Sequence, residues 1–296
     1  VYFVHNDVDT IEKTARELAE MMVGATLTPP ERRAGEKGEV ALGVSDLSLA
    51  SPIPFGTSLK GISFAVSKGE VLGIAGVAGN GQDELLLALS GEITTEPDRI
   101  RIHSHPVGDL GPVERRKVGL VAAPEERLGH AAAPNMSLTE NALLSGAVRK
   151  GLTQNGFIDW AGTESFARAI IDGFDVRTPG THVAARALSG GNLQKFVIGR
   201  ELMQDPEVIV INQPTWGVDA AAAASIRQAI LDRAAAGAAV VVISQDLDEL
   251  LEIADTFAAL NEGRMTRPRP VEGLSIEEIG LMMGGAHGME VAHHGA

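Results

Sequence analysis

Short apolar runs separated by polar and glycine-rich stretches dominate the second half of the chain. Two unbroken β-branched runs, Val208–Ile211 and Val240–Ile243, are typical of strands buried on both faces of a parallel sheet. Between them, Ala220–Ala235 is alanine-rich and long enough for a helix that connects the two strands. The order strand, helix, strand predicts an α/β fold.

A second group of elements precedes this pair. Glu39–Leu49 and Gly61–Val66 alternate apolar and polar residues, as antiparallel strands do when one face is solvated. Val71–Ala75 is a short apolar strand that ends in a glycine-rich turn, and Gln82–Ser90 has the pattern of a helix. We therefore expect an antiparallel sheet to pack beside the parallel one.

The region between these groups has a different composition. Residues 124–190 are rich in Ala, Ser and Gly, and we expect them to form mostly helices and loops. A further helix is expected over Leu193–Met203. The pattern thus predicts a helical subdomain over about 124–190, inserted into the α/β body.

Both ends of the chain contain a similar segment. Residues 11–24 read IEKTARELAEMMVG, and Ser275–Gly285 repeats one Glu, both Met and one Gly of it, 261 positions later. Four shared residues in eleven fit either two unrelated amphipathic helices or a tandem repeat. In the second case, residues 1–24 are the tail helix of a preceding copy.

The domain boundaries follow from composition. Residues 25–38 are rich in Pro, Gly and charge, as a linker is, and we expect the globular domain to cover 39–285. Residues 286–296 have no periodicity and are expected to form a disordered tail. The chain starts with Val and shows no signal peptide, which fits a processed chain or a fragment cut from a longer one.

Composition and charge narrow the function classes. The 296 residues include no cysteine, which excludes disulfides, thiolate metal sites and a cysteine nucleophile. With 25 Lys and Arg against 39 Asp and Glu, the formal net charge is −14, which disfavours a broad basic surface for nucleic acid. The longest nearly continuous apolar run, Ala234–Ile243, has about half the length of a membrane span.

The turn after the strand Val71–Ala75 resembles a phosphate-binding loop with altered charge. A P-loop reads G-x-x-x-x-G-K-[ST], and here Gly76 and Gly81 keep the spacing while Gln82 and Asp83 replace the Lys and the hydroxyl residue. A unit charge about 4 Å away is worth about 4 kcal/mol at an effective dielectric of about 20, so tight triphosphate binding is disfavoured. The candidate binding residues are Gly76, Gly79, Asn80, Gly81, Gln82 and Asp83.

Leu188–Lys195, reading LSGGNLQK, forms a second candidate anion site. Ser189 can cap the following helix, and the free backbone N–H groups of Gly190 and Gly191 can donate to an anion. An ordinary glycine turn before a helix explains Ser-Gly-Gly equally well when these three residues are taken alone.

Amides stand where two of the apolar strands end. Asn212 and Gln213 follow Val208–Ile211, at positions where many nucleoside triphosphatases carry an Asp that orients Mg²⁺ and a Glu that polarises water. Gln245 follows the strand that ends at Ser244, where a His could contact a γ-phosphate. An amide positions water but accepts no proton, so these residues predict a site without hydrolysis. The pattern gives no metal ligands.

Taken in order, these motifs resemble the nucleotide-binding domain of ABC transporters over about residues 39–285. The loop at Gly76–Asp83, LSGGN-x-Q-K at 188–195, QPT-x-G-x-D and S-x-D-L-D-E occur in the family's order. The chain is most similar to the second, degenerate half of ATP-binding subunits that import simple sugars or nucleosides. PEERLG at 124–129 and FDVRTPG at 174–180 favour the nucleoside branch.

The resemblance implies a P-loop NTPase fold with a RecA-like core, an antiparallel β subdomain and a helical subdomain. It also implies roles for single residues. Asn212 replaces the metal-orienting Asp, Gln213 the catalytic Glu and Gln245 the switch His, while Asp219 matches the D-loop. Glu125 lies near the Q-loop position, which is not Gln here. Only the signature is intact, at Ser189, Gly190, Gly191 and Asn192.

This asymmetry implies a division of labour within the family's head-to-tail dimer. The domain is expected to supply its signature in trans to ATP and Mg²⁺ held by the first half of the same subunit, and to contact a membrane permease from the cytoplasmic side. Alone, it is expected to bind ATP weakly or not at all, and a weak homodimer is possible. The alternatives are a non-hydrolytic regulatory module and a non-transport ABC ATPase, the latter acting on nucleic acid or the ribosome.

Overall fold

A mostly parallel sheet forms the centre of the molecule. The computed structural model describes residues 37–52 and 54–285. Its largest sheet has the strand order β12-β11-β3-β10-β9-β6, in which the last five strands are parallel and β12 and β13 pair antiparallel with β11. These strands are β3 (Val71–Ala75), β6 (Leu120–Ala123), β9 (Val208–Asn212), β10 (Ala239–Ser244), β11 (Thr256–Asn261), β12 (Arg264–Met265) and β13 (Arg269–Pro270).

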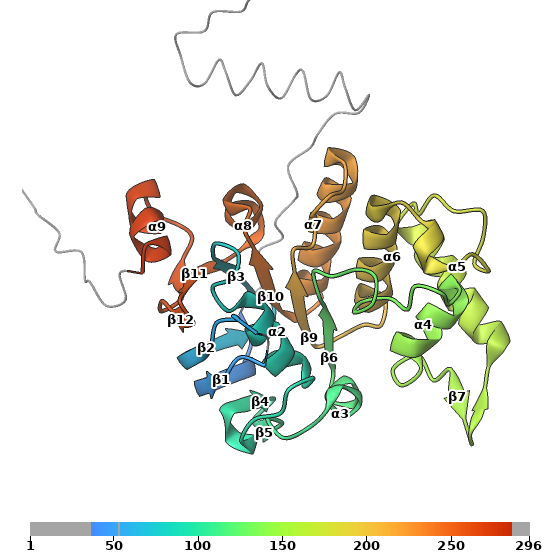
Figure 1. Cartoon of the computed structure of the whole chain (residues 1–296), viewed down its shortest axis with the longest axis horizontal. Coiled ribbons are helices and arrows are strands. Elements are labelled where there is room, and N and C mark those ends of the chain that lie inside the picture. The colour runs from blue at the N-terminus through green and yellow to red at the C-terminus, as the bar shows by residue number, and fades with distance from the viewer. Residues whose placement is uncertain (1–36, 53, 286–296) are drawn as a thin grey trace, which may run out of the picture.

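A smaller antiparallel sheet lies beside the central one, as the alternating pattern predicts. Its order is β2-β1-β4-β5, and β1 pairs antiparallel with both β2 and β4. In Figure 1 this sheet lies on the side of α2 that faces away from α7. Its strands are β1 (Val40–Leu49), β2 (Leu59–Ser67), β4 (Ile100–Ile102) and β5 (His105–Pro106), with the 3₁₀ turn Pro97–Arg99 before β4.

Helices cover the two faces of the central sheet, and each face has its own apolar core. Val240 and Val242 of β10 face the core formed with α6, α7 and α8, whereas Val241 and Ile243 face the core formed with α2 and the antiparallel sheet. The helices are α2 (Gln82–Ser90), α3 (Pro112–Lys117), α4 (Leu138–Gly146), α5 (Trp160–Gly173), α6 (Gly190–Leu202), α7 (Ala220–Ala235), α8 (Leu247–Ile253) and α9 (Ile276–Met283). The alternation of facing residues explains why these strands are unbroken apolar runs.

A helical region lies at one end of the molecule, where the sequence predicts it. α4, α5 and α6 pack together there, and a short 3₁₀ turn, Ala185–Ala187, precedes α6 (Figure 1). The region also holds a hairpin, β7 (Thr153–Gln154) and β8 (Phe157–Ile158), which the composition did not predict because two-residue strands carry no periodicity.

The sequence-based boundaries are close to the observed ones, with instructive exceptions. Val71–Ala75, Gln82–Ser90 and Ala220–Ala235 are confirmed to the residue. The helix expected from Leu193 begins three residues earlier, because Ser189 caps a first turn that holds two glycines. The elements that were not predicted also include β4, β5, β6, β11, β12, β13, α3 and α8. The tail helix 1–24, most of the linker 25–38 and the tail 286–296 lie outside the described residues.

Candidate functional site

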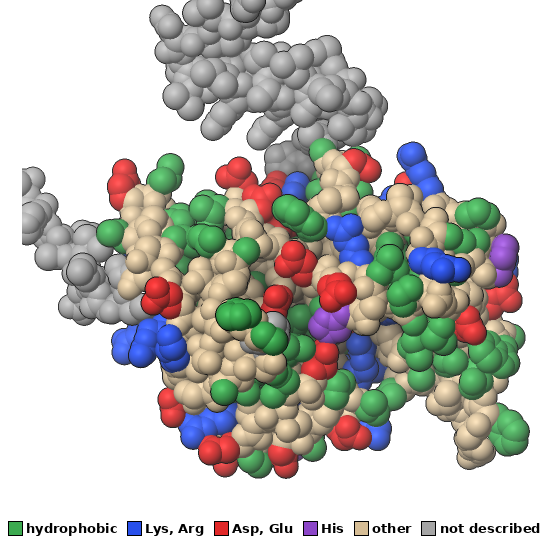
Figure 2. All heavy atoms as spheres, viewed as in Figure 1, with side chains coloured by type: hydrophobic (Ala, Val, Ile, Leu, Met, Phe, Trp, Pro, Cys, Tyr) green, Lys and Arg blue, Asp and Glu red, His purple; other side chains and the backbone are tan. Residues whose placement is uncertain are grey.

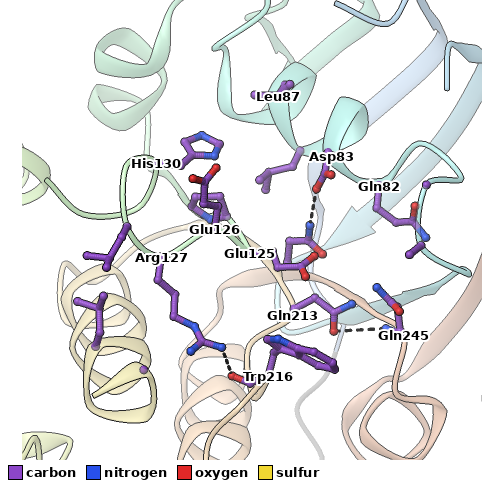
Figure 3. A pocket seen from close by; sticks show the side chains of 18 of the residues that line it. Gln82, Asp83, Leu87, Glu125, Glu126, Arg127, His130, Gln213, Trp216 and Gln245 are labelled. Atoms are coloured by element: carbon purple, nitrogen blue, oxygen red, sulfur yellow. Dashed lines mark hydrogen bonds between the residues drawn. The ribbon is translucent and has the colours of Figure 1, made fainter. Parts of the chain in front are cut away.

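The carboxyl ends of neighbouring parallel strands meet at one edge of the sheet, where α/β proteins place their ligands. β3, β10 and β9 are adjacent, and the turns after them border a cavity of about 850 Å³. We refer to this cavity as the P-loop pocket. The residues of the sequence-predicted site that line it are Gly79, Gln82, Asp83, Glu125, Gly190, Asn212, Gln213 and Gln245. Figure 3 shows most of these side chains converging on it.

Gln82 is turned into its own loop. Its Oε1 accepts from the Asn80 N–H at 2.9 Å, and its Nε2 donates to the Val77 carbonyl at 2.9 Å. The residue is only 8% exposed, and a Cβ added at Gly76 would lie 2.5 Å from its Nε2. The glutamine amide thus occupies the Asn80 N–H, a donor that would otherwise be available to a phosphate.

The loop is fixed in shape from outside as well. Asn80 Oδ1 accepts from the Glu262 N–H at 2.9 Å, and its carbonyl accepts from the Gly263 N–H at 3.0 Å. Gly81 stands before α2 with φ of 110°, a conformation that favours glycine. On α2, Glu84 accepts from the Thr57 N–H at 2.9 Å and so points away from the pocket. The fold of a P-loop is therefore retained although its lysine is absent.

Acidic groups dominate the pocket. Asp83 Oδ1 accepts from Asn212 Nδ2 at 3.1 Å, which joins α2 to the end of β9. Burial raises the pKa of Asp83, and the charge of Glu84 adds to this effect. Burial also raises the pKa of Glu125, and the charge of Asp83 adds to it. Figure 2 shows acidic side chains gathered in the middle of this face, between α2 and α6. These carboxylates oppose a further anion close to them, while Arg127 and His130 also line the pocket.

The raised pKa of Asp83 predicts a pH-dependent effect of Asp83→Asn. A carboxyl whose pKa is raised by folding adds stability below its unfolded pKa, and this contribution is lost as the pH rises through the folded value. We expect Asp83→Asn to raise the free energy of unfolding at pH 7 by only roughly half a kcal/mol. The pocket covers part of Asp83, but much of the residue's surface remains open to solvent, which weakens the effect, and an asparagine can still accept from Asn212.

The gain in Asp83→Asn should shrink as the pH falls toward the ordinary aspartate pKa of 3.8, because the wild-type carboxyl then becomes protonated. Urea unfolding at pH 7 and pH 4 measures this difference. Asp232→Asn, on the surface of α7, is the control and should show no such trend. A destabilised Asp83→Asn at pH 7 would show that the ionised carboxylate is favoured in the pocket.

The side-chain amide of Gln213, after β9, contacts the end of the neighbouring strand β10. Gln213 has φ of 54° and is 4% exposed, and its Oε1 lies 3.4 Å from Ser244 Oγ and 3.5 Å from the Gln245 N–H. Behind them, the buried Glu249 accepts from Thr215 Oγ1 at 2.6 Å and from Ser244 Oγ at 2.8 Å. Since both oxygens of Glu249 are engaged, it braces the strand ends and is not placed to take a proton from water.

Part of the predicted site lies in a second cavity of about 440 Å³, which we call the signature cavity. Ser189 and Asp219 line it, each as the N-cap of a helix: Ser189 accepts from the Asn192 N–H and Asp219 from the Ala222 N–H. Gly191 and Asn192 line it too, whereas Gly190 borders the P-loop pocket. The beginning of α6 therefore separates the two cavities.

Arg127 lies between the P-loop pocket and the start of α6, and the sequence analysis did not include it among the site residues. Its Nη2 donates to the Trp216 carbonyl at 2.5 Å (Figure 3), and a Cβ added at Gly190 would lie 2.7 Å from its Nη1. Trp216 itself is 59% exposed at the mouth of the pocket. Both residues lie within motifs that the sequence analysis identified, because Arg127 belongs to PEERLG and Trp216 to QPT-x-G-x-D.

His130 and Glu126, also missed, complete the rim of the pocket. His130 Nε2 lies 2.6 Å from Glu92 Oε2, and this contact raises the pKa of His130. Within residues 37–52 and 54–285, no group of three or more Asp, Glu, His or Cys side chains could hold a metal ion. In the same ranges, no helix has the length and apolar character to cross a bilayer.

Proteins of similar sequence and structure are known. A model of the ABC transporter family matches residues 59–216. The chain is 33% identical to the nucleoside import ATP-binding protein NupA of Lactococcus lactis and 32% to the guanosine import ATP-binding protein NupO of Bacillus subtilis. It is 35% identical to the glucose import ATP-binding protein TsgD13 of Haloferax volcanii. These alignments cover 94–95% of this chain but 51–56% of the relatives, so the chain spans about half their length.

Solved structures show the same fold. The ATP-binding subunit of an ABC transporter superposes with a TM-score of 0.65 at 22% identity, covering 82% of this chain and 99% of the other. An ATP-binding cassette in a dimeric state after hydrolysis, with ADP and phosphate bound, gives 0.66 at 19% identity, covering 79% and 100%. The fold is thus the ABC-type P-loop NTPase fold, as the order of motifs implies.

Proposed function

The chain belongs to the ABC transporter family, and on this basis we propose that it is the non-hydrolytic nucleotide-binding domain of an importer subunit. Its signature, Ser189–Asn192, acts on ATP that a partner domain holds. The partner is the first half of the same subunit, since the relatives are about twice as long as this chain. One observation carries the proposal: Gln82, Asp83, Asn212 and Gln213 line the P-loop pocket at the positions of the catalytic and phosphate-binding groups, while Ser189 and the start of α6 keep their hydrogen-bond donors at the signature cavity.

The P-loop pocket has room for a nucleotide but not the chemistry for Mg²⁺ and a triphosphate. Its volume of about 850 Å³ lies in the range of ordinary ligand sites. Gln82 is bonded within its loop, and Asp83 stands at the position where a hydroxyl would meet Mg²⁺. The side-chain amide of Asn212 donates a hydrogen bond to Asp83. We infer that this chain binds ATP weakly by itself.

The signature cavity fits a phosphoryl group. α6 begins there with two glycines, so its first N–H groups are accessible and carry the positive end of the helix dipole. Ser189 is exposed and offers a hydroxyl at the same point. These donors stabilise negative charge on a phosphate that is bound by another domain, without any catalytic base in this chain.

The transported compound is expected to be a nucleoside or a simple sugar. The relatives are named for nucleoside, guanosine and glucose import. In this proposal the domain lies at the cytoplasmic face of the membrane and moves with a permease. A cavity of about 330 Å³ between α3 and α4 offers a place for a permease segment, because Pro112, Arg116 and the 58%-exposed Leu144 border it.

Calorimetry and turnover test the proposal. We expect only weak ATP binding to this chain alone, and ATP hydrolysis when the chain is combined with an upstream half that carries an intact P-loop. Ser189→Ala should lower that turnover about 100-fold, as the loss of one oxyanion donor does. Ser165→Ala, on the exposed face of α5, is the control and should leave turnover unchanged.

Two results would contradict the proposal. One is rapid hydrolysis by the isolated chain, which would indicate an active, non-transport ATPase. The other is unchanged turnover of Ser189→Ala in the combined protein. Copurification with a polytopic permease separates an importer domain from a regulatory module, which would not bind one.

A further inference from the structure

Hydrogen bonds around Asn192 set the direction of the Ser189 hydroxyl. Asn192 Oδ1 accepts from the backbone N–H of Arg177 at 2.9 Å, and Asn192 Nδ2 lies 2.9 Å from Ser189 Oγ. A backbone N–H only donates, so the oxygen of the amide must face Arg177 and its nitrogen must face Ser189. The orientation of this amide therefore follows from its partners.

The consequence concerns the hydrogen of the hydroxyl. Ser189 Oγ receives the Asn192 side-chain amide at 2.9 Å and the Asn192 backbone N–H at 3.5 Å. With its lone pairs engaged by two donors, the hydroxyl directs its own hydrogen elsewhere. The signature cavity, which Ser189 lines, is the open space beside it.

We propose that Asn192 is a positioning residue that makes Ser189 an obligatory hydrogen-bond donor to a phosphoryl oxygen in the signature cavity. The inference rests on the proposed function, in which this cavity receives the phosphate of ATP bound by the partner. An alcohol that is free to rotate gives its hydrogen to the phosphate in only some of its staggered positions. The fixed amide removes the others, so the donor is arranged before the phosphate arrives.

The arrangement also selects the class of ligand. The outward hydrogen of Ser189 and the first N–H groups of α6 are all donors, so the part of the cavity beside the start of α6 suits a group that accepts, such as a phosphoryl group. Asp172, Asp175 and Asp219 also line the cavity, so this preference belongs to the start of α6 and not to the cavity as a whole.

We call the hydrogen bonds from Arg177 through Asn192 to Ser189 the relay, and the variant Asn192→Asp tests its direction. The substitution keeps the shape of the side chain and reverses the hydrogen bond between residue 192 and the Ser189 hydroxyl. One carboxylate oxygen still accepts from Arg177, while the other accepts the hydrogen of Ser189 and draws it away from the cavity. In the combined protein we expect Asn192→Asp to lower kcat about 100-fold, as far as Ser189→Ala does. Asn192→Ala should lower kcat only about threefold, since the hydroxyl then samples three staggered positions.

A double variant separates this relay from simple charge repulsion. If Asn192→Asp acts through Ser189, adding it to Ser189→Ala should change kcat less than about threefold, because coupled residues are not additive. A further large fall in the double variant would show that the new charge repels ATP and would overturn the inference. So would an Asn192→Ala variant as slow as Asn192→Asp. Unchanged turnover of Ser189→Ala would instead refute the proposed function.

A second measurement needs only this chain. The Arg177 amide hydrogen should exchange more slowly with solvent in the wild type and in Asn192→Asp than in Asn192→Ala, which has no acceptor for it. Equal exchange in the wild type and Asn192→Ala would show that the relay does not form. Thermal unfolding of each variant checks that the domain is folded.

Discussion

The double variant Gln82→Lys/Asp83→Ser is expected to bind ATP at least 100-fold more tightly than the wild-type chain. Lysine cannot accept a hydrogen bond, so it releases the Asn80 N–H that Gln82 now occupies. The two substitutions also add two units of positive charge beside the phosphates, where each unit at about 4 Å is worth up to about 4 kcal/mol at an effective dielectric of about 20. Calorimetry with ATP and Mg²⁺ measures the change.

A control variant carries the same two types of substitution on α7, outside the P-loop. Gln228 and Asp232 lie four residues apart on α7, and Gln228 Nε2 donates to Asp232 Oδ1 at 3.0 Å. Gln228→Lys/Asp232→Ser changes the net charge equally but leaves the P-loop intact, so ATP binding should stay as weak as in the wild type. Equal affinities of the two double variants would show that the loop's charge does not limit binding. Tighter binding should come without hydrolysis, because Gln213 remains an amide.

Glu201→Gln is expected to lower the free energy of unfolding at pH 7 by about 3–5 kcal/mol, the range for breaking a buried ion pair. Glu201 is fully buried, with Arg116 Nη1 at 2.7 Å and Arg200 Nε at 2.9 Å. Ser145 Oγ of α4 also donates to it at 2.6 Å. Without the carboxylate, Arg200 keeps a buried charge that no partner neutralises.

The loss in Glu201→Gln should depend on pH. Burial alone would raise the pKa of Glu201, but Arg116 and Arg200 hold it below the ordinary value of 4.5. A lowered pKa adds stability above the unfolded value, and this stability is lost as the pH falls through the folded value. We therefore expect the free energies of unfolding of the wild type and Glu201→Gln, measured in urea, to approach each other only as the pH falls below the ordinary glutamate value of 4.5.

A surface pair provides the comparison for this prediction. Glu164 and Arg168 form an exposed ion pair on α5, one helical turn apart. Glu164→Gln should change the free energy of unfolding by less than about 0.5 kcal/mol, both at pH 7 and at acidic pH. If Glu201→Gln behaves like Glu164→Gln, the buried network does not hold α3 and α4 against α6.

The linear sequence determined the parts of the site that depend on local order. Strand β3, the loop Gly76–Gly81 and helix α2 follow directly from a short apolar run, glycine spacing and a helical pattern. The same holds for the capped start of α6 at Ser189. These features could be predicted because the residues that specify them are adjacent in the chain.

Two of the parallel strands of the central sheet, β6 and β11, could not be predicted because distant residues specify them. β6, LVAA, and β11, TFAALN, are short and show little contrast between apolar and polar positions. They are strands because they pair with β9 and β3, which lie far away in sequence. Propensity alone does not specify such strands, since burial between neighbours decides them.

Only the tertiary structure decided which groups meet. Asp83 and Asn212 are 129 residues apart, and Arg127 and Trp216 are 89 apart, yet each pair is hydrogen-bonded. The sequence determined that the P-loop lacks its lysine and that the signature is complete. Packing decided that Gln82 folds back into its loop, that Asp83 and Glu125 share one pocket, and that Asn192 fixes Ser189. Hydrogen bonds and charges act over a few ångströms, so their partners are known only once the chain has folded.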